Sequence, residues 1–390
     1  MSDLARLRIA VVGTGLMGAS VALGAKRAGA LEVAGYDVEE RSLAAAVERG
    51  AIDKPNESLV DAVHGADVVV VAVPVGELPA VVSAVLAVAT DSCTVTDVGS
   101  TKGSVCAAAG SAANFVGGHP VCGSEARGAD HASAELFEGA TWFLTPLACT
   151  GPEHYRQLHA FVSALGAAPV AIAPSGHDRL VALTSHLPHA LANLVANQAG
   201  NARIEGHDPL AAAGGSLRDM TRVAGANPRV WVDIFLDNRE EMLVALAAHR
   251  RAVEQLETVL ADRTGDALAT WIAEAAANRR RVLQAAYATD PGDLHEVRVH
   301  VADEPGVLAR VTQALGAERI NIEDFELRHL SPERGGVLGV LVAGEKEALR
   351  AAELLESEGY GVVVSPVVGA LARPPSNGSP APAHSSLPPA

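Results

Sequence analysis

One histidine in this chain is placed where it would be able to take a proton from a substrate. His119 follows a glycine pair and precedes a proline, and Cys122 lies three residues further on. A neutral imidazole has a reference pKa of about 6.5, so His119 would be a base at neutral pH and would lose that capacity near this pKa as the pH falls. Histidines flanked by glycines are also frequent in ordinary turns, so the residue alone leaves a structural interpretation open.

A second polar motif precedes this histidine. Ser100 and Lys102 follow directly after the apolar run over residues 93–98, which is expected to form a buried strand. The carboxyl ends of parallel strands border the ligand crevice of such a sheet. We therefore expect both side chains to point at the crevice that contains His119. The alternatives are that Ser100 caps the strand end and that Lys102 is a solvated surface charge.

A glycine-rich turn near the N-terminus predicts a dinucleotide site. It follows a β-branched run at residues 8–12, opens an alanine-rich segment, and precedes Asp37 by roughly 20 residues. Glycines permit the tight turn and bring backbone amides close to a pyrophosphate, while the acid accepts a hydrogen bond from a ribose hydroxyl. Asp37 would repel a 2′-phosphate, which favours NAD over NADP, and Arg41 would soften this preference. The predicted cofactor-binding residues are Gly13, Gly15, Leu16, Met17, Gly18 and Asp37.

A hydride acceptor beside an imidazole base suits the oxidation of an alcohol, because the hydroxyl loses a proton while its carbon loses a hydride. The composition agrees with a soluble enzyme of 390 residues, 49% of them hydrophobic. A net charge of −16 argues against a nucleic-acid or anionic-membrane partner. The four cysteines show no Cys-x-x-Cys pattern, and no signal peptide or membrane-spanning run is evident, so we expect a cytoplasmic protein.

The order of predicted elements indicates an α/β protein with three domains. Strand and helix alternate through residues 1–173, with continuous apolar runs at 66–73, 93–98 and 140–144, as expected for a Rossmann domain. Residues 174–290 are predicted to be all helical. From Asn227 and Pro228 onwards, apolar residues recur at helical spacing through one helix of roughly 30 residues, longer than a small domain needs. Its extra apolar face favours packing on a second subunit, which predicts a homodimer.

The C-terminal region changes pattern again. Residues 294–370 are expected to alternate as β-α-β-β-α-β, a ferredoxin-like unit that follows a linker near Pro291-Gly292-Asp293. Residues 371–390 are rich in proline and serine without an apolar period, so they are expected to be a disordered tail.

Five ordered motifs now identify a family. The chain resembles prephenate dehydrogenases, which include the arogenate-specific enzymes, over roughly residues 8 to 290. The motifs are G-T-G-L-M-G, D-V-G-S-T-K, G-G-H-P-V-C-G-S-E, S-H-L-P-H and G-G-S-L-R-D-M-T-R-V-A-G-A-N-P-R-V-W. The C-terminal unit is similar to an ACT domain, through D-E-P-G-V-L and I-N-I-E. The resemblance implies an NAD-dependent oxidoreductase of tyrosine biosynthesis.

The resemblance also implies roles for the catalytic residues. His119 would take the proton of the C4 hydroxyl of prephenate while hydride leaves C4 for NAD, after which the ring loses CO₂ and becomes aromatic. Ser100 would act at the same hydroxyl and hold His119 in register. His189 would lie on the substrate side of the crevice, with His186 as structural support. His186 and His189 are three residues apart, but no further ligand is evident nearby, so we predict no metal.

Other side chains would recognise the substrate. Prephenate carries two carboxylates, and Arg222 is the best candidate to hold one of them, because a guanidinium grips a carboxylate through two bonds. Asp219 or Glu125 would orient Arg222. Trp231 would close the pocket or, alternatively, be a core aromatic at a helix start. Cys122 is rejected as a nucleophile, since hydride transfer needs none.

Three functions remain open from the sequence. Prephenate would give 4-hydroxyphenylpyruvate, whereas arogenate would give tyrosine by the same chemistry, and the sequence hardly separates them. A non-catalytic amino-acid sensor is the third hypothesis, and the joint presence of His119, Ser100 and Arg222 argues against it. In the C-terminal unit, the helix N-terminus at Gly306 and Val307 would bind an amino acid's carboxylate, with Asn321 taking its ammonium or a backbone group. Tyrosine is the expected ligand and inhibitor; the alternative is a module that only dimerises.

Overall fold

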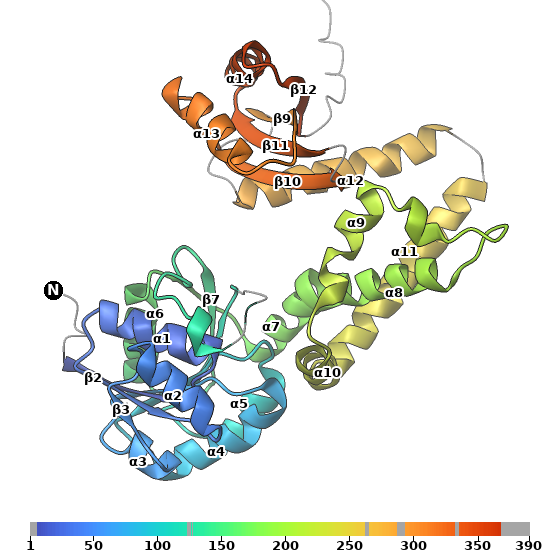
Figure 1. The fold of residues 1–390 in the computed structure, drawn as a ribbon. Coiled ribbons are helices and arrows are strands. Elements are labelled where there is room, and N and C mark those ends of the chain that lie inside the picture. Colours follow the sequence, from blue (N-terminus) through green and yellow to red (C-terminus); the bar gives the residue numbers. More distant parts are fainter. Residues whose placement is uncertain are drawn as a thin grey trace, which may run out of the picture. The chain divides into compact units, whose positions relative to one another are not determined.

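The computed structural model describes residues 6–122, 126, 128–261, 265–286, 293–331 and 335–367. These residues pack as two compact units (Figure 1), the first ending at Val253 and the second beginning at Glu254.

A parallel sheet forms the N-terminal layer of the first unit. Its strand order is β3-β2-β1-β4-β5, so β1 lies between β2 and β4. The chain therefore leaves β1 in one direction for β2 and reaches β4 on the opposite side, which creates a crevice at the carboxyl end of β1. The strands are β1 (Arg8–Val12), β2 (Glu32–Tyr36), β3 (Lys54–Pro55), β4 (Val68–Val71) and β5 (Thr94–Asp97).

Both faces of this sheet are covered, as the continuous apolar runs predicted. Ile9 and Val11 of β1 pack in one hydrophobic cluster, and Ala10 and Val12 pack in another on the opposite face. The first cluster includes residues of α1 (Leu16–Arg27), α2 (Glu40–Glu48) and α6 (Pro152–Ala164). The second includes residues of α3 (Leu59–Val63), α4 (Leu78–Val88) and α5 (Gly103–Ala109).

His119 lies on a strand that the sequence analysis did not predict. β6 (Val116–Pro120) pairs antiparallel with β7 (Thr141–Pro146), which pairs parallel with β8 (Ala168–Ala171). The run at 140–144 was expected to be a parallel strand. As part of β7, it is parallel to β8 and antiparallel to β6. The glycine pair before His119 reflects close packing, because a Cβ on Gly118 would lie 2.6 Å from the carbonyl oxygen of Asp97.

The helical part of the first unit contains a break where one long helix was expected. α10 (Pro228–Asp237) is followed by Asn238, which has φ −97° and ψ 28°, and α11 (Arg239–Ala261) begins directly after it. Asn238 is 3% exposed, and its side chain hydrogen-bonds to the carbonyl oxygen of Asp178 and to the ring of His186. These tertiary contacts hold Asn238 at the break between the two helices. The preceding helices are α7 (Pro174–Val181), a π-helical turn (Ala182–His186), α8 (Leu187–Asn201) and α9 (Gly215–Thr221).

The second unit contains the C-terminal end of α11, then α12 (Gly265–Ala286) and the predicted β-α-β-β-α-β fold, which the structure confirms. Its antiparallel sheet has the order β10-β11-β9-β12, and one face of it packs on α13 (Val307–Ala317) and α14 (Glu345–Ser357). The strands are β9 (Leu294–Val301), β10 (Asp324–Ser331), β11 (Gly335–Ala343) and β12 (Gly361–Pro366). Pro291, Gly292 and the predicted tail at 371–390 lie outside the described residues.

Candidate active site

A cavity of about 570 Å³ in the first unit brings the main predicted catalytic residues together. Ser100 reaches it from the end of β5, His119 from β6, and Trp231 from α10, as the sequence analysis expected. Most of the remaining wall is apolar, as in binding pockets for small molecules. Its other lining residues are Val121, Cys122, Phe143, Leu180, Val181, Thr184, Ser185, His186 and Ile234.

A hydrogen-bonded chain of three side chains lies behind His119. The Nδ1 atom of His119 is 2.8 Å from Nε2 of His177, and Nδ1 of His177 is 2.8 Å from Oδ1 of Asp178. His177 is fully buried and Asp178 is 7% exposed. Ser100 was expected to hold His119, but among the described residues the hydrogen-bond partner of the His119 ring is His177.

The electrostatics of this chain keep His119 neutral. Burial lowers the pKa of His119 well below 6.5, and the nearby His177 and Lys102 lower it further. Burial alone would raise the pKa of Asp178, but hydrogen bonds from His177 and from the amides of Lys102 and Gly103 outweigh it, so this pKa is lowered. A neutral imidazole therefore faces the cavity with an ionised carboxylate two bonds behind it.

Lys102 is not a solvated surface charge, which was the alternative that the sequence analysis left open. Its side chain is fully buried and pairs with the equally buried Asp97. Its Nζ donates to the carbonyl oxygen of Gly118 at 2.8 Å, and the amide of Gly118 donates to Asp97 Oδ1 at 3.1 Å. A buried ion pair is retained only where further hydrogen bonds satisfy it. Here the two hydrogen bonds fix both the carbonyl and the amide of Gly118, the residue that precedes His119.

An aromatic wall borders the cavity. The ring of His189 stacks on Trp231 with centroids 3.5 Å apart, and Nδ1 of His189 lies 3.0 Å from the carbonyl oxygen of Ser185. His186, beside them, has Nδ1 3.1 Å from the side-chain nitrogen of Asn238. The two histidines thus have separate protein partners, and no group of three or more metal-ligating side chains occurs in the described part of the chain.

The predicted carboxylate ligand lies next to this wall. Arg222 begins a short 3-10 helix after α9 and is exposed. Burial lowers the pKa of His189, and the Arg222 guanidinium lowers it further, which places this cation near the His189 ring. Asp219 lies on α9, and Glu125 falls outside the described residues.

Cys122 lines the cavity but is unsuited to act as a nucleophile. Burial raises the pKa of its thiol to about 11, so the sulfur stays protonated at neutral pH. This agrees with the rejection of a Cys-His mechanism.

The glycine-rich turn has the geometry of a nucleotide site. Gly13 has φ +91°, and a Cβ there would lie 2.5 Å from the carbonyl oxygen of Ala72, so only glycine fits. Gly15 caps α1, and among the described residues no side chain bonds to its first amides, which leaves the N-terminus at Leu16 and Met17 open to an anion. Asp37 accepts hydrogen bonds from the amide of Thr14 at 2.6 Å and from the amide of Glu39 at 2.9 Å.

Gly13 and Asp37 also line a cavity of about 230 Å³ with apolar side chains around it. An acid tied to the glycine turn beside an apolar cleft fits a ribose and its base. The residues present therefore fit a dinucleotide. The other lining residues are Val12, Tyr36, Val38, Leu59, Val73, Glu77 and Val81.

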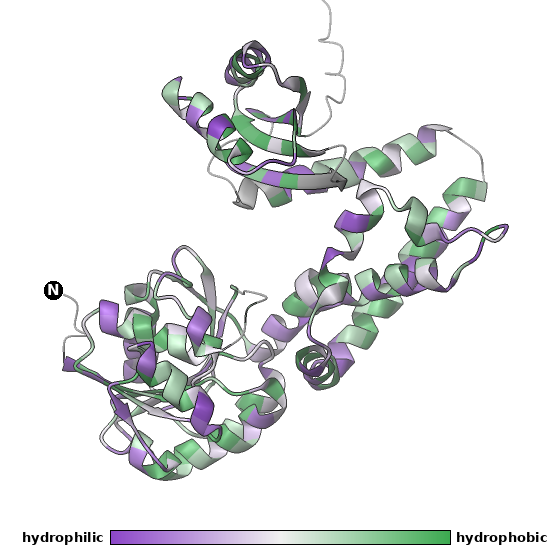
Figure 2. Cartoon of the chain, viewed as in Figure 1, coloured by the Kyte–Doolittle hydropathy of each residue, from purple (hydrophilic) through white to green (hydrophobic). Residues whose placement is uncertain are grey.

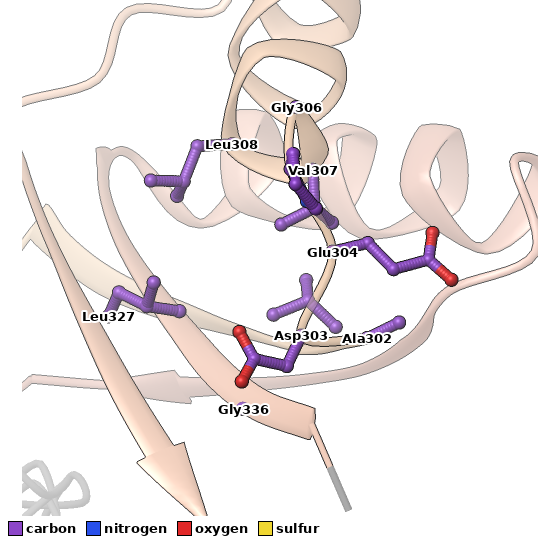
Figure 3. A pocket seen from close by; sticks show the side chains of 10 residues that line it. Ala302, Asp303, Glu304, Gly306, Val307, Leu308, Leu327 and Gly336 are labelled. Atoms are coloured by element: carbon purple, nitrogen blue, oxygen red, sulfur yellow. The ribbon is translucent and has the colours of Figure 1, made fainter. Parts of the chain in front are cut away.

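A separate cavity of about 350 Å³ lies at the N-terminus of α13 in the second unit. Gly306 has φ +87° and caps this helix, with Val307 as its first residue. Figure 3 shows Leu308 and Leu327 on one side of the turn and Glu304 directed away from them. Asn321 is not among the lining residues; it precedes β10 and donates to Glu323 Oε1 at 2.8 Å, so its expected ligand role is not supported.

Family profiles match nearly the whole described chain. Residues 21–171 match the nucleotide-binding domain of prephenate dehydrogenase, 173–274 its dimerization domain, and 295–359 an ACT domain. The prephenate dehydrogenase of Lactococcus lactis is 30% identical over 333 residues, 83% of this chain and 88% of that protein. The chain therefore belongs to the prephenate dehydrogenase family of oxidoreductases.

Two solved structures resemble this one to nearly the same degree. Prephenate dehydrogenase from A. aeolicus, in complex with hydroxyphenyl propionate and NAD+, has a TM-score of 0.67 and 28% identity, covering 72% of this chain and all of that one. Synechocystis arogenate dehydrogenase has a TM-score of 0.65 and 28% identity, covering 71% and 100%. The predicted family, fold class and nucleotide-binding domain are confirmed, and NAD as the predicted cofactor agrees with the first of these structures.

The sequence analysis missed three residues of the site. His177 and Asp178 form an adjacent His-Asp pair at a predicted helix start, which is a usable signal for a histidine held by a carboxylate. Asn238 stands inside an apolar helical period, where a buried asparagine gives no distinct pattern.

No described helix is long and apolar enough to span a membrane.

Proposed function

We propose that this chain oxidises and decarboxylates prephenate to 4-hydroxyphenylpyruvate and CO₂ with NAD. The observation that carries the proposal is the neutral His119, backed by two buried partners and facing a largely apolar cavity together with Ser100. A base held in this way suits removal of a hydroxyl proton. The membership of the family and the fit of the glycine turn to a dinucleotide support the same reaction.

The chain's own residues account for the proton in this reaction. When bound at the glycine turn, NAD would supply the hydride acceptor for C4 of the substrate. His119 accepts the hydroxyl proton at Nε2, because its Nδ1 is already engaged with His177. Ser100 lines the same cavity, and its hydroxyl is the proposed hydrogen-bond partner of the reacting hydroxyl. Loss of the ring carboxylate as CO₂ then makes the ring aromatic, which provides the driving force.

The substrate's carboxylates require cations at the wall. Arg222 is assigned to one carboxylate of prephenate, with His189 on the same side. Glu125 and Asp219 keep their proposed role in orienting Arg222. Trp231 closes the cavity, since its indole is stacked on His189 and lines the pocket directly.

Arogenate is the second candidate substrate. It differs from prephenate by an amino group in place of a keto group on the side chain, so the same base, cavity and cofactor serve both. The near-equal similarity to a prephenate and an arogenate dehydrogenase favours testing them together. Purified protein is assayed for NADH formation with each substrate side by side. Turnover of arogenate alone would replace the proposed substrate, and turnover of neither would contradict the proposed function.

We also propose a homodimer formed through the helical region. Figure 2 shows hydrophobic residues recurring along α10 and α11, and several are widely exposed, Leu236 at 67% and Val244 at 62%. A contiguous exposed apolar patch commonly marks a protein interface, so the exposed apolar side chains of these helices are the proposed contact surface. The match to a dimerization domain at residues 173–274 supports the same conclusion. Light scattering on the purified protein tests it, and a monomer at micromolar concentration would exclude it.

The C-terminal unit is proposed to bind tyrosine and inhibit the enzyme. The turn at Gly306 presents the first amides of α13 to a carboxylate, next to the apolar side chains of Leu308 and Leu327. Asp303 lines the same cavity and replaces Asn321 as the partner for the ligand's ammonium. Tyrosine, the end product of the pathway, has a carboxylate, an ammonium and an aromatic ring, one for each of these three parts of the cavity.

A further inference from the structure

We propose that His177 and Asp178 are positioning residues that keep a proton on Nδ1 of His119 and then share the proton that His119 takes from the substrate. This inference rests on the proposed function, in which His119 is the base. Neither residue lines the cavity. They act on the reaction through the hydrogen bond between His119 and His177.

The location of each proton follows from the acceptor at the end of the chain. Both oxygens of Asp178 accept backbone hydrogen bonds, Oδ1 from Lys102 at 2.8 Å and Oδ2 from Gly103 at 2.7 Å. A carboxylate with these donors is an acceptor only, so Nδ1 of His177 must donate to it. A His177 ring that holds only this proton carries a lone pair on Nε2.

That lone pair decides the tautomer of His119. Because Nε2 of His177 can only accept, Nδ1 of His119 must be the donor across their 2.8 Å contact. The remaining nitrogen of His119, Nε2, is left without a proton. An imidazole in the opposite tautomer would present an N–H to the substrate hydroxyl and would be unable to act as a base.

The same chain offers a place for the proton after catalysis. When Nε2 of His119 has accepted the substrate proton, its Nδ1–H bond can break as an N–H bond forms on Nε2 of His177. The positive charge then lies on His177, next to the Asp178 carboxylate. The transfer leaves His119 neutral, and it adds or removes no electrons.

The surrounding charges favour this arrangement. Lys102 and Asp97 face the chain from β5 and the loop that follows it, and they form a buried pair whose charges cancel. His186, from the π-helical turn, is neutral because burial lowers its pKa to about 4. The rings of Phe143 and His177 meet in a T-shaped arrangement with centroids 5.5 Å apart. One net negative charge, that of Asp178, therefore remains in the buried cluster to balance one proton.

A purely structural role is the competing explanation. Asp178 ties α7 to the N-terminus of α5, and Asn238 bonds to the Asp178 carbonyl, so both residues also brace the fold. Two substitutions separate these roles. His177→Gln keeps an acceptor oxygen near the Nε2 position but cannot become a cation, whereas His177→Leu removes the acceptor altogether.

His154→Gln is the matched control. His154 is a buried histidine on α6 that is hydrogen-bonded to Thr94 and lies outside the catalytic cavity. We expect His177→Leu to lower kcat by about 10²–10⁴-fold, the range seen when a base loses its orienting partner. The Gln variant should lose about tenfold to a hundredfold. KM should stay within about threefold in both variants, and the control should keep wild-type kcat.

Nitrogen-15 NMR of histidine-labelled full-length protein provides a readout that does not depend on activity. The wild type should show His119 protonated on Nδ1, His177→Gln should keep this tautomer, and His177→Leu should lose it. Detection of His119 with its proton on Nε2 in the wild type would overturn the proposal, as would folded Gln and Leu variants with wild-type kcat. If the wild type turns over neither prephenate nor arogenate but shows the expected tautomer, the proposed function fails while the positioning role stands.

Discussion

The catalytic cavity and the C-terminal cavity are built from different kinds of contact. Around His119, hydrogen bonds join residues that are distant in sequence: His119 and His177 are 58 positions apart, and Lys102 and Asp178 are 76 positions apart. The C-terminal cavity takes most of its wall from one stretch, residues 301–308, and is completed by Leu327 and Gly336.

This difference matches what each cavity is proposed to do. Proton abstraction requires a defined tautomer and a fixed position, which buried long-range hydrogen bonds provide. Binding a regulatory amino acid requires only donors and an apolar surface, which a single turn at a helix N-terminus supplies. We therefore expect substitutions in the catalytic cavity to have large effects on kcat, and those at the turn to have modest effects on affinity.

The largest effect is expected from loss of the base. His119→Asn should lower kcat by about 10²–10⁴-fold, because a positioned base contributes that much to the rate. The Kd for NAD should stay near wild type, since His119 lies in the catalytic cavity and not in the one that contains Gly13 and Asp37. Steady-state kinetics and calorimetric NAD titration check both statements. A variant that keeps a tenth or more of wild-type kcat at neutral pH would contradict the assignment of His119 as the base.

The pH profile tests the environment of the same residue. A histidine with its ordinary pKa would lose activity near pH 6.5, but burial lowers the pKa of His119 well below that value. The base therefore stays neutral as the pH falls through 6.5, and the acid limb of kcat/KM should lie below this pH. Rates measured in overlapping buffers from pH 4.5 to 8 locate the limb. A midpoint at or above about 6.5 would show that His119 is not desolvated as the structure indicates.

The next effect concerns the substrate's charge. A charge-assisted hydrogen bond contributes about 1.5–3 kcal/mol, so Arg222→Ala should raise KM by roughly tenfold to a hundredfold. Arg203→Ala is a suitable control, because Arg203 is an exposed arginine of the helical region that pairs with Asp208. The Kd for NAD should not move in either variant. Collapse of NAD affinity with an unchanged KM would make Arg222 a cofactor or structural residue instead.

The fold was predictable from local patterns to a large extent. Apolar runs located β1, β4 and β5, and the alternation after residue 294 located all four strands of the C-terminal unit. The expected single helix after Pro228 was wrong because Asn238 obtains its hydrogen bonds from Asp178 and His186, which are distant in sequence. Strand β6 was missed because two of its five residues are glycines, which have low strand propensity and are present for close packing.

The site residues show the same difference between local patterns and tertiary packing. His119, Ser100 and the glycine turn were identified because each belongs to a short motif. The partner of His119 and the burial of Lys102 were not, because both depend on where α7 and β6 meet in space. Ser100 was expected to orient His119, and only the structure shows His177 at the nitrogen concerned.

A smaller effect is expected at the cofactor. The Asp37 carboxylate favours a free ribose hydroxyl and repels a 2′-phosphate, so kcat/KM should favour NAD over NADP by at least about tenfold. Asp37→Ser should narrow this preference, with Arg41 available to the phosphate. The Asp37 carboxylate also accepts hydrogen bonds from the amides of Thr14 and Glu39, so the melting temperature of the variant is measured alongside. Equal use of both cofactors by the wild type would show that another group overrides Asp37.

The smallest effect is expected from the C-terminal cavity. Coupling between distant sites is typically about 1–3 kcal/mol, so saturating tyrosine should weaken apparent substrate affinity severalfold or more. Gly306→Asp places a carboxylate where the ligand's carboxylate is proposed to bind, and it should abolish this inhibition while leaving kcat unchanged. Gly359→Asp is the matched control: Gly359 also has a positive φ, +92°, with open space around it, but it does not line the cavity.

Tyrosine resembles the reaction product, so competition at the catalytic cavity must be separated from regulation. A chain ending after residue 290 lacks the C-terminal cavity and should remain active while losing only the regulatory component of inhibition. Isothermal calorimetry of the full chain should then show tyrosine binding that Gly306→Asp removes and Gly359→Asp preserves. If the full chain binds no tyrosine, phenylalanine or tryptophan, the sensing role is wrong, and the C-terminal unit acts in dimerisation alone. Equal loss of binding in both glycine variants would place the cause in backbone strain rather than in the cavity at Gly306.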